Sequence, residues 1–70
     1  MFGDEVGTVR AVRAFQLHGL PWWDVSVELD AGGMEEIRLG DESVPGGLAA
    51  GDRVRIARAG LVVIGLAREM

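Results

Sequence analysis

The stretch Gly51–Arg68, GDRVRIARAGLVVIGLAR, decides the fold, because no other part of the chain is so continuously apolar or so clearly patterned. Val54 and Ile56 alternate with arginines, which is the two-residue period of a half-buried strand, and Arg58-Ala59-Gly60 supplies a glycine turn. After the turn, Leu61–Leu66 is apolar at every position. Such a strand is expected to be covered on both faces, so the stretch predicts a β-hairpin within a closed barrel or beneath a partner chain.

The composition limits what kind of protein this is. The chain has 70 residues, no cysteine and a formal net charge of −4. The length predicts one domain, and the lack of cysteine excludes disulfides and cysteine-based metal sites. The negative charge disfavours non-specific binding to nucleic acid or to anionic membranes. Because Met1–Glu5 is not basic and no apolar run approaches the ~18 residues of a membrane span, we expect a cytoplasmic chain without membrane attachment.

The first strand is expected over Glu5–Leu17, and its pattern changes phase along the way. Val9 and Phe15 lie at odd positions, whereas Val6 and Val12 lie at even positions. A strand with apolar residues on both sides is either fully buried or bent. A bend or bulge would let this one strand join both sheets of a small barrel.

The second and third strands follow from a regular alternation. A loop at His18–Pro21 is expected first, because glycine and proline interrupt a strand ladder. From Trp23 to Leu29 every odd residue is apolar, which predicts a strand with that set facing inward. The turn residues Asp30–Gly33 then lead into a third strand at Met34–Leu39.

The remaining segment, Gly40–Ala50, is rich in glycine and is interpreted as a surface connection with a short turn of helix at most. Five strands with short connections predict an all-β, closed or partly open barrel of the oligonucleotide/oligosaccharide-binding (OB) type, with an SH3-like barrel as the alternative. The expected core consists of Val9, Phe15, Trp23, Val25, Val27, Leu29, Ile37, Leu39, Val54, Ile56, Leu61 and Val63.

A family resemblance accompanies this pattern. It rests on Gly51, Val54, Ile56, Gly60, Leu61, Val63 and Ile64. Here the chain resembles the closing hairpin of OB-like domains, nearest the soluble C-terminal domain of the NfeD membrane-protein family. The opening Val6–Val9 is also similar to that domain's first strand. The resemblance covers about a third of the chain and implies an OB-like fold without assigning a functional residue. The chain departs from the family in its longer central hairpin, Trp22–Leu39, and in having no membrane segment.

Residues with catalytic potential are few. His18 stands without a serine or cysteine nucleophile beside it, so it is interpreted as a solvated loop residue. Asp41 and Glu42 are acidic neighbours in a glycine-rich connection, but a hard-cation site needs further oxygen ligands at defined spacing. No glycine-rich stretch has the lysine of a phosphate loop. We therefore expect a non-catalytic binding or assembly module that acts through protein contacts, with no cofactor and no metal.

Trp22 has the opposite parity to the inward-facing Trp23 and is expected on the outer side of the sheet. An exposed aromatic ring flanked by the outward arginines Arg38, Arg53 and Arg55 would suit stacking of single-stranded bases, which makes nucleic-acid binding the alternative function. The same face also carries Asp24, Glu28, Asp30 and Glu36. Ion pairs between these acids and the arginines explain the mixture without a ligand.

Self-association is the last expectation. Apolar residues make up 49% of the chain, and the last strand is apolar on both faces, although a small barrel has a narrow interior. A homo-oligomer, or else a different protein partner, would cover the outward set, which comprises Trp22, Val62, Ile64 and Leu66. The alternative is a monomer in which Met1 and Phe2 or the 40–50 connection cap this strand.

Overall fold

A computed structural model describes residues 5–69 and contains one five-stranded antiparallel sheet, with β1 at its centre. Along the chain the elements are β1 (Glu5–Leu17), β2 (Leu20–Leu29), β3 (Met34–Gly40), the single 3₁₀ turn η1 (Asp41–Ser43), β4 (Arg53–Ala59) and β5 (Val62–Arg68). The strand order is β3-β2-β1-β4-β5, and among the described residues no strand pairing joins the two edges, so the sheet is not closed. The all-β class and the five strands are therefore confirmed.

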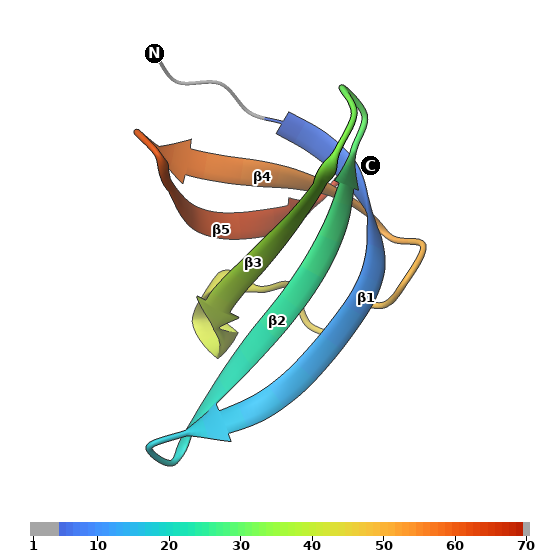
Figure 1. Ribbon diagram of the computed structural model, residues 1–70. Coiled ribbons are helices and arrows are strands. Elements are labelled where there is room, and N and C mark those ends of the chain that lie inside the picture. The colour runs from blue at the N-terminus through green and yellow to red at the C-terminus, as the bar shows by residue number, and fades with distance from the viewer. Residues whose placement is uncertain (1–4, 70) are drawn as a thin grey trace.

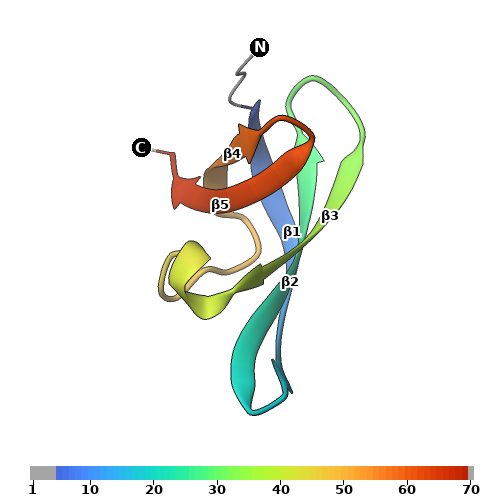
Figure 2. The ribbon, with the colours of Figure 1, turned by 90° about the vertical axis from the view of Figure 1, so that its left-hand side faces the viewer.

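The sheet bends so that β4 and β5 lie across the inner side of β1, β2 and β3 (Figures 1 and 2). The core fills the space between these two layers and consists of Val9, Val25, Val27, Ile37, Leu39, Leu48, Val54, Ile56 and Leu66. Seven of these were predicted from alternation, and Trp23, Leu29 and Val63 pack against them partly buried, as expected for the rim of a small core.

A bulge in β1 corrects the prediction that Phe15 lies in the core. The register with β2 shifts between Val9 and Ala11, which leaves Arg10 without a directly opposite residue. One extra residue reverses the alternation, so Val12 faces the core after the bulge and Phe15 faces outward. The predicted phase change is thus present, and Phe15 was assigned to the wrong side of it.

A second bulge, in β5, corrects two further expectations. The register with β4 shifts so that Ile64 has no direct partner, because Ala57 pairs with Gly65 whereas the next residue of β4 pairs with Val63. The shift turns Leu66 inward, where only 8% of it is exposed, although it was predicted to face outward. Leu61, predicted in the core, lies in the turn before β5 and is 98% exposed.

The first hairpin reaches beyond the rest of the sheet. β1 pairs with β4 only over Glu5–Thr8, whereas it pairs with β2 as far as Leu17 and Leu20 (Figure 1). We call the β1–β2 segment 11–26 the arm. The connection is only His18-Gly19, with φ of 54° and 76°, so the predicted loop His18–Pro21 is shorter than expected. These two positive φ values are those of a type I′ hairpin turn.

Different contacts close the two ends of the core between the layers. At one, the guanidinium of Arg58 donates to Glu5 Oε1 (2.9 Å from Nε) and also to Glu35, which ties β4 to β1 and β3. At the other, Trp23 Nε1 donates to Asp41 Oδ1 (2.9 Å). Leu48 adds a buried side chain from the connection that was interpreted as purely superficial. Met1 and Phe2, offered as a cap for β5, lie outside the described residues.

Candidate functional site

The outer face of β1, β2 and β3 carries the most organised set of polar and aromatic side chains on the described surface. Strand pairing arranges it in rows from the arm tip upward: Leu17 with Leu20, Phe15 with Trp22, Arg13 with Asp24 and Arg38, and Ala11 with Ser26 and Glu36. Because alternate residues of paired strands share a face, each row presents its side chains together. We call these rows the outer face.

Asp24 is the electrostatic centre of the outer face. Its Oδ2 accepts from Arg13 Nη2 (2.9 Å) and Arg38 Nη2 (3.0 Å), and its Oδ1 accepts from Arg38 Nε (2.8 Å). The two-point contact with Arg38 and the second contact with Arg13 hold the pKa of Asp24 at about 2. A carboxylate ionised at neutral pH therefore neutralises one of the two cations, and the row keeps one net positive charge.

The aromatic row lies next to this ion row. Phe15 pairs with Trp22 across β1 and β2, and both are half-buried. The guanidinium carbons of Arg38 and Arg13 lie 4.6 and 5.4 Å from the Phe15 ring centroid, which is within cation–π range. Two arginines thus already contact the Phe15 ring, whereas within residues 5–69 no arginine lies over the ring of Trp22.

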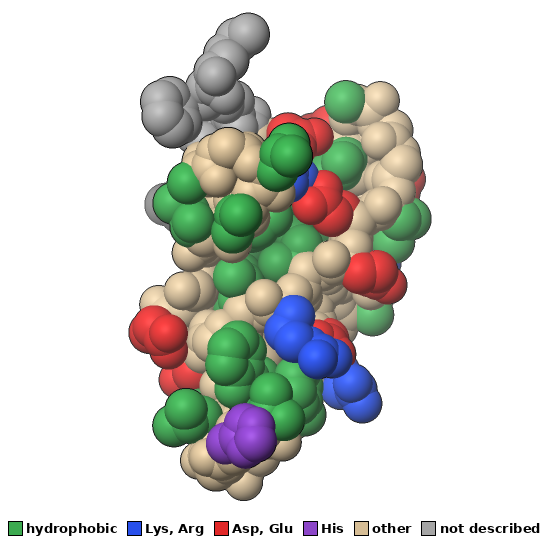
Figure 3. Space-filling view, turned by 60° about the vertical axis from the view of Figure 1, so that its left-hand side comes forward, with side chains coloured by type: hydrophobic (Ala, Val, Ile, Leu, Met, Phe, Trp, Pro, Cys, Tyr) green, Lys and Arg blue, Asp and Glu red, His purple; other side chains and the backbone are tan. Residues whose placement is uncertain are grey.

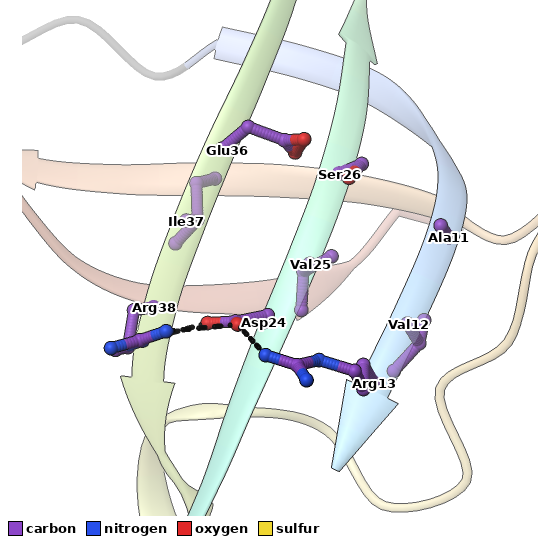
Figure 4. A pocket seen from close by; sticks show the side chains of 9 residues that line it. All are labelled: Ala11, Val12, Arg13, Asp24, Val25, Ser26, Glu36, Ile37 and Arg38. Carbon is purple, nitrogen blue, oxygen red and sulfur yellow. Dashed lines mark hydrogen bonds and ion pairs between the residues drawn. The ribbon is translucent and has the colours of Figure 1, made fainter. Parts of the chain in front are cut away.

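A hollow of about 490 Å³ opens in the row of small residues, where Ala11 and Ser26 leave space between longer neighbours (Figure 4). The ion row bounds it on one side, with Arg13, Asp24 and Arg38 labelled in the close-up, and Glu36 stands on β3 at the other. Its chemistry is a floor of small side chains edged by charges of both signs.

The four residues of the predicted binding surface separate into two groups. Trp22 and Arg38 belong to the outer face, whereas Arg53 and Arg55 lie on β4. Arg53 donates to both carboxylate oxygens of Asp30 (2.7 and 2.6 Å), which lowers the pKa of that acid. Asp30 is eight residues from Trp22, or about 26 Å along an extended strand. The structure therefore does not bring the four residues together on one binding surface.

The predicted self-association residues also divide. Val62 and Ile64 are exposed on β5, where they are 64% and 54% accessible, and Leu66 is in the core. Trp22 lies on the arm instead. Leu17 and Leu20 extend the exposed apolar surface at the arm tip, and apolar side chains gather at both ends of the molecule in Figure 3.

Residues considered for catalysis are dispersed. His18 is exposed at the arm tip, Asp41 accepts the hydrogen bond from Trp23, and Glu42 follows it in η1. Within residues 5–69 no group of three or more His, Asp or Glu could hold a metal ion. In the same range, no helix is long and apolar enough to cross a membrane.

Comparison with models of known protein families, with curated proteins and with solved structures finds no match to this chain. The outer face therefore has to be interpreted from its own residues. Three of its members, Arg13, Phe15 and Asp24, were not among the candidate binding residues predicted from sequence. The sequence did contain a signal for Arg13 and Phe15. Val12 is an apolar residue at an even position, so a register shift before it would place Arg13 and Phe15 on the same face as Trp22.

Proposed function

We propose that this chain is a non-catalytic assembly module with an OB-like barrel fold, and that it acts through protein–protein contacts, first of all with further copies of itself. One observation carries the proposal. Every arginine in the chain has a carboxylate partner within 4.0 Å. Large apolar side chains, in contrast, are exposed at the arm tip and in the β4–β5 hairpin; they are Leu17, Leu20, Leu61, Val62 and Ile64. Apolar contact is therefore the interaction that this surface offers most readily.

The strand order supports the fold part of the proposal. β1 is shared between the meander of β1, β2 and β3 and the hairpin of β4 and β5, as in a five-stranded barrel that is partly open. The opening falls between β3 and β5, and η1 lies near β5 there. An OB-like barrel fits this arrangement, and the NfeD domain is the family that it would resemble.

The charge pattern supports the functional part. The arginines that would contact phosphates, Arg38, Arg53 and Arg55, are held by acids. Their partners are Asp24, Asp30 and Glu69. Rim ion pairs of this kind contribute little to stability, but a ligand would have to displace or share them. An apolar partner displaces only water from Leu17, Leu20 and Ile64.

The test is the mass in solution by light scattering at tens of micromolar. A multiple of the 7.5 kDa chain mass that falls to one chain in Ile64→Asp or Trp22→Asp supports assembly through these surfaces. A mass of 7.5 kDa that does not rise with concentration contradicts self-assembly.

Single-stranded nucleic-acid binding is the second candidate, and the row of Phe15 and Trp22 beside Arg38 favours it. Base stacking on Trp22 would be sequence-tolerant and salt-dependent. A fluorescence titration with mixed oligonucleotides at two salt concentrations tests it. Micromolar affinity that is lost in Trp22→Ala would replace the assembly proposal, whereas weak binding that Trp22→Ala leaves unchanged argues against this second function.

A further inference from the structure

The arm has a free strand edge that the body of the molecule does not cover. Pairing between β1 and β4 ends at Thr8, and the last contacts on that side are the hydrogen bonds from Val9 N to Asp52 O (2.8 Å) and from Gly51 N to Val9 O (2.7 Å). Beyond the bulge, residues 11–17 pair with β2 on one side only within the described chain. Along these seven residues, the backbone amide and carbonyl groups that point away from β2 therefore face no neighbouring strand.

The turn identifies which backbone groups face this edge. In a two-residue type I′ hairpin, the residues flanking the turn form the hydrogen-bonded closing pair, here Leu17 and Leu20. The alternation of an antiparallel ladder then directs every second residue of β1 toward β2, which leaves Val12, Ala14 and Gln16 with their N–H and C=O groups pointing away. These groups have no other backbone partner among residues 5–69.

We propose that this edge binds the same edge of a second copy, in antiparallel pairing around a two-fold axis at Ala14. The inference rests on the proposed function and specifies its contact. Ala14 pairs with its own counterpart and Val12 with the partner's Gln16, so six backbone hydrogen bonds are available from these three residues of each chain. The two arms, with the β3 strand that pairs with β2 in each chain, then form one continuous six-stranded sheet.

The register at Ala14 follows from length and charge. Ala14 is the midpoint of residues 11–17, so this axis pairs the whole free edge. Arg13 is the one charged residue there, and an axis at Arg13 would set two like charges opposite each other, which is destabilising. The axis at Ala14 instead places Arg13 opposite the partner's Phe15, an aromatic ring that arginine already contacts within the chain.

The other edges are less suited to this pairing. β3 carries Glu35, Glu36 and Arg38 within seven residues, and charges on an edge oppose strand addition. η1 lies against β5, where the carbonyl oxygen of Ser43 is 3.6 Å from the position that a Cβ would take on Gly65. The arm, in contrast, extends clear of the β4–β5 layer in both views (Figures 1 and 2).

Substitutions at the axis give a specific test, because Ala14 is exposed and would lie directly opposite itself. The wild-type chain is expected to have twice the 7.5 kDa mass of one chain by light scattering. Ala14→Glu and Ala14→Lys should each reduce the mass to one chain, since like charges would then meet at the axis. An equimolar mixture of the two variants should recover the doubled mass, because the opposite charges pair.

Gln16→Glu is the matched control, since residue 16 faces the partner's Val12 rather than itself, and it should keep the dimer. Circular dichroism of each variant checks that the sheet remains folded. A dimer that survives Ala14→Glu but dissociates in Ile64→Asp overturns this inference and leaves the proposed assembly function intact. A wild-type chain that stays monomeric overturns both, and failure of the mixed variants to associate excludes the axis at Ala14.

Discussion

The two halves of β1 have opposite surroundings. The half before the bulge, Glu5–Val9, pairs with β4 over Glu5–Thr8 and with β2 over Gly7–Val9, and Val9 is fully buried. The half after it, Ala11–Leu17, has one paired neighbour, and Leu17 is 41% exposed. The difference shows that a single extra residue at Arg10 divides a structural half from a half that is free to interact.

The largest expected effect is loss of core packing around the first half. Ile56 of β4 pairs with Glu5 of β1 and is fully buried, so Ile56→Ala should lower the free energy of unfolding by about 2–4 kcal/mol. Val27→Ala, opposite Val9, should act in the same way. Chemical denaturation measures this. Leu20→Ala, on the arm at 60% exposure, should change stability by less than about 0.5 kcal/mol, and an equal loss there would contradict the division.

The next largest effect is expected at Gly7, where the backbones of β1 and β2 approach closely. A Cβ on Gly7 would lie 2.6 Å from both Glu28 O and Val27 Cγ1, so β1 and β2 would have to separate. Gly7→Ala is expected to destabilise by about 1–3 kcal/mol, as overpacking does in tight cores. Gly46→Ala is the control, because no atom lies within 4 Å of its added Cβ. Similar melting temperatures for the two variants would show that the approach at Gly7 is not limiting.

Two substitutions in the arm turn should change the stability in opposite directions. Gly19 has φ of +76° in open space, so Gly19→Ala should cost about 1 kcal/mol through backbone strain alone. His18 has φ of +54°, and His18→Asn creates the Asn-Gly pair preferred in type I′ turns, which should stabilise the hairpin slightly. Thermal unfolding compares both variants with the wild type. Stabilisation by Gly19→Ala would mean that the turn is not type I′ in solution.

Most core residues could be predicted from the sequence, whereas the side that each residue faces in the bulged strands β1 and β5 could not. Alternation over Val25, Val27 and Ile37 specifies the buried side, because a one-residue slip would expose the whole set. Nothing in a local pattern marks where one residue is inserted, so Phe15 and Leu66 were assigned to the wrong sides. Leu48 was missed because burial from an irregular connection has no period.

Of the candidate site, the outward parity of Trp22 and Arg38 was predictable and the organisation around Asp24 was not. Trp22 and Arg38 lie on the outer face as alternation requires. Asp24 meets both Arg13 and Arg38 because β2 lies between β1 and β3, and that order is a property of the whole sheet. The ion pair between Arg53 of β4 and Asp30, which follows β2, likewise depends on the strand order, because β1 lies between β2 and β4.

The smallest effect is a pH dependence that originates in the outer face of the arm. Contacts with Arg38 and Arg13 lower the pKa of Asp24 to about 2, whereas an unfolded aspartate titrates at about 3.9. A carboxyl group with a depressed folded pKa stabilises the fold above its unfolded pKa, and this contribution is lost as the pH falls through the folded value. Stability should therefore decrease between about pH 4 and pH 2, and less steeply in Asp24→Asn.

Asp30 keeps part of this dependence in the variant, because its pKa is lowered by Arg53. Glu36→Gln is the matched control on the same face, since Glu36 forms no ion pair among residues 5–69, and it should retain the wild-type slope. Denaturation midpoints measured at several pH values compare the three proteins. If Asp24→Asn and the wild type lose stability in parallel below about pH 4, the Asp24 ion pairs do not persist in solution, and the outer face of the arm lacks its organising charge.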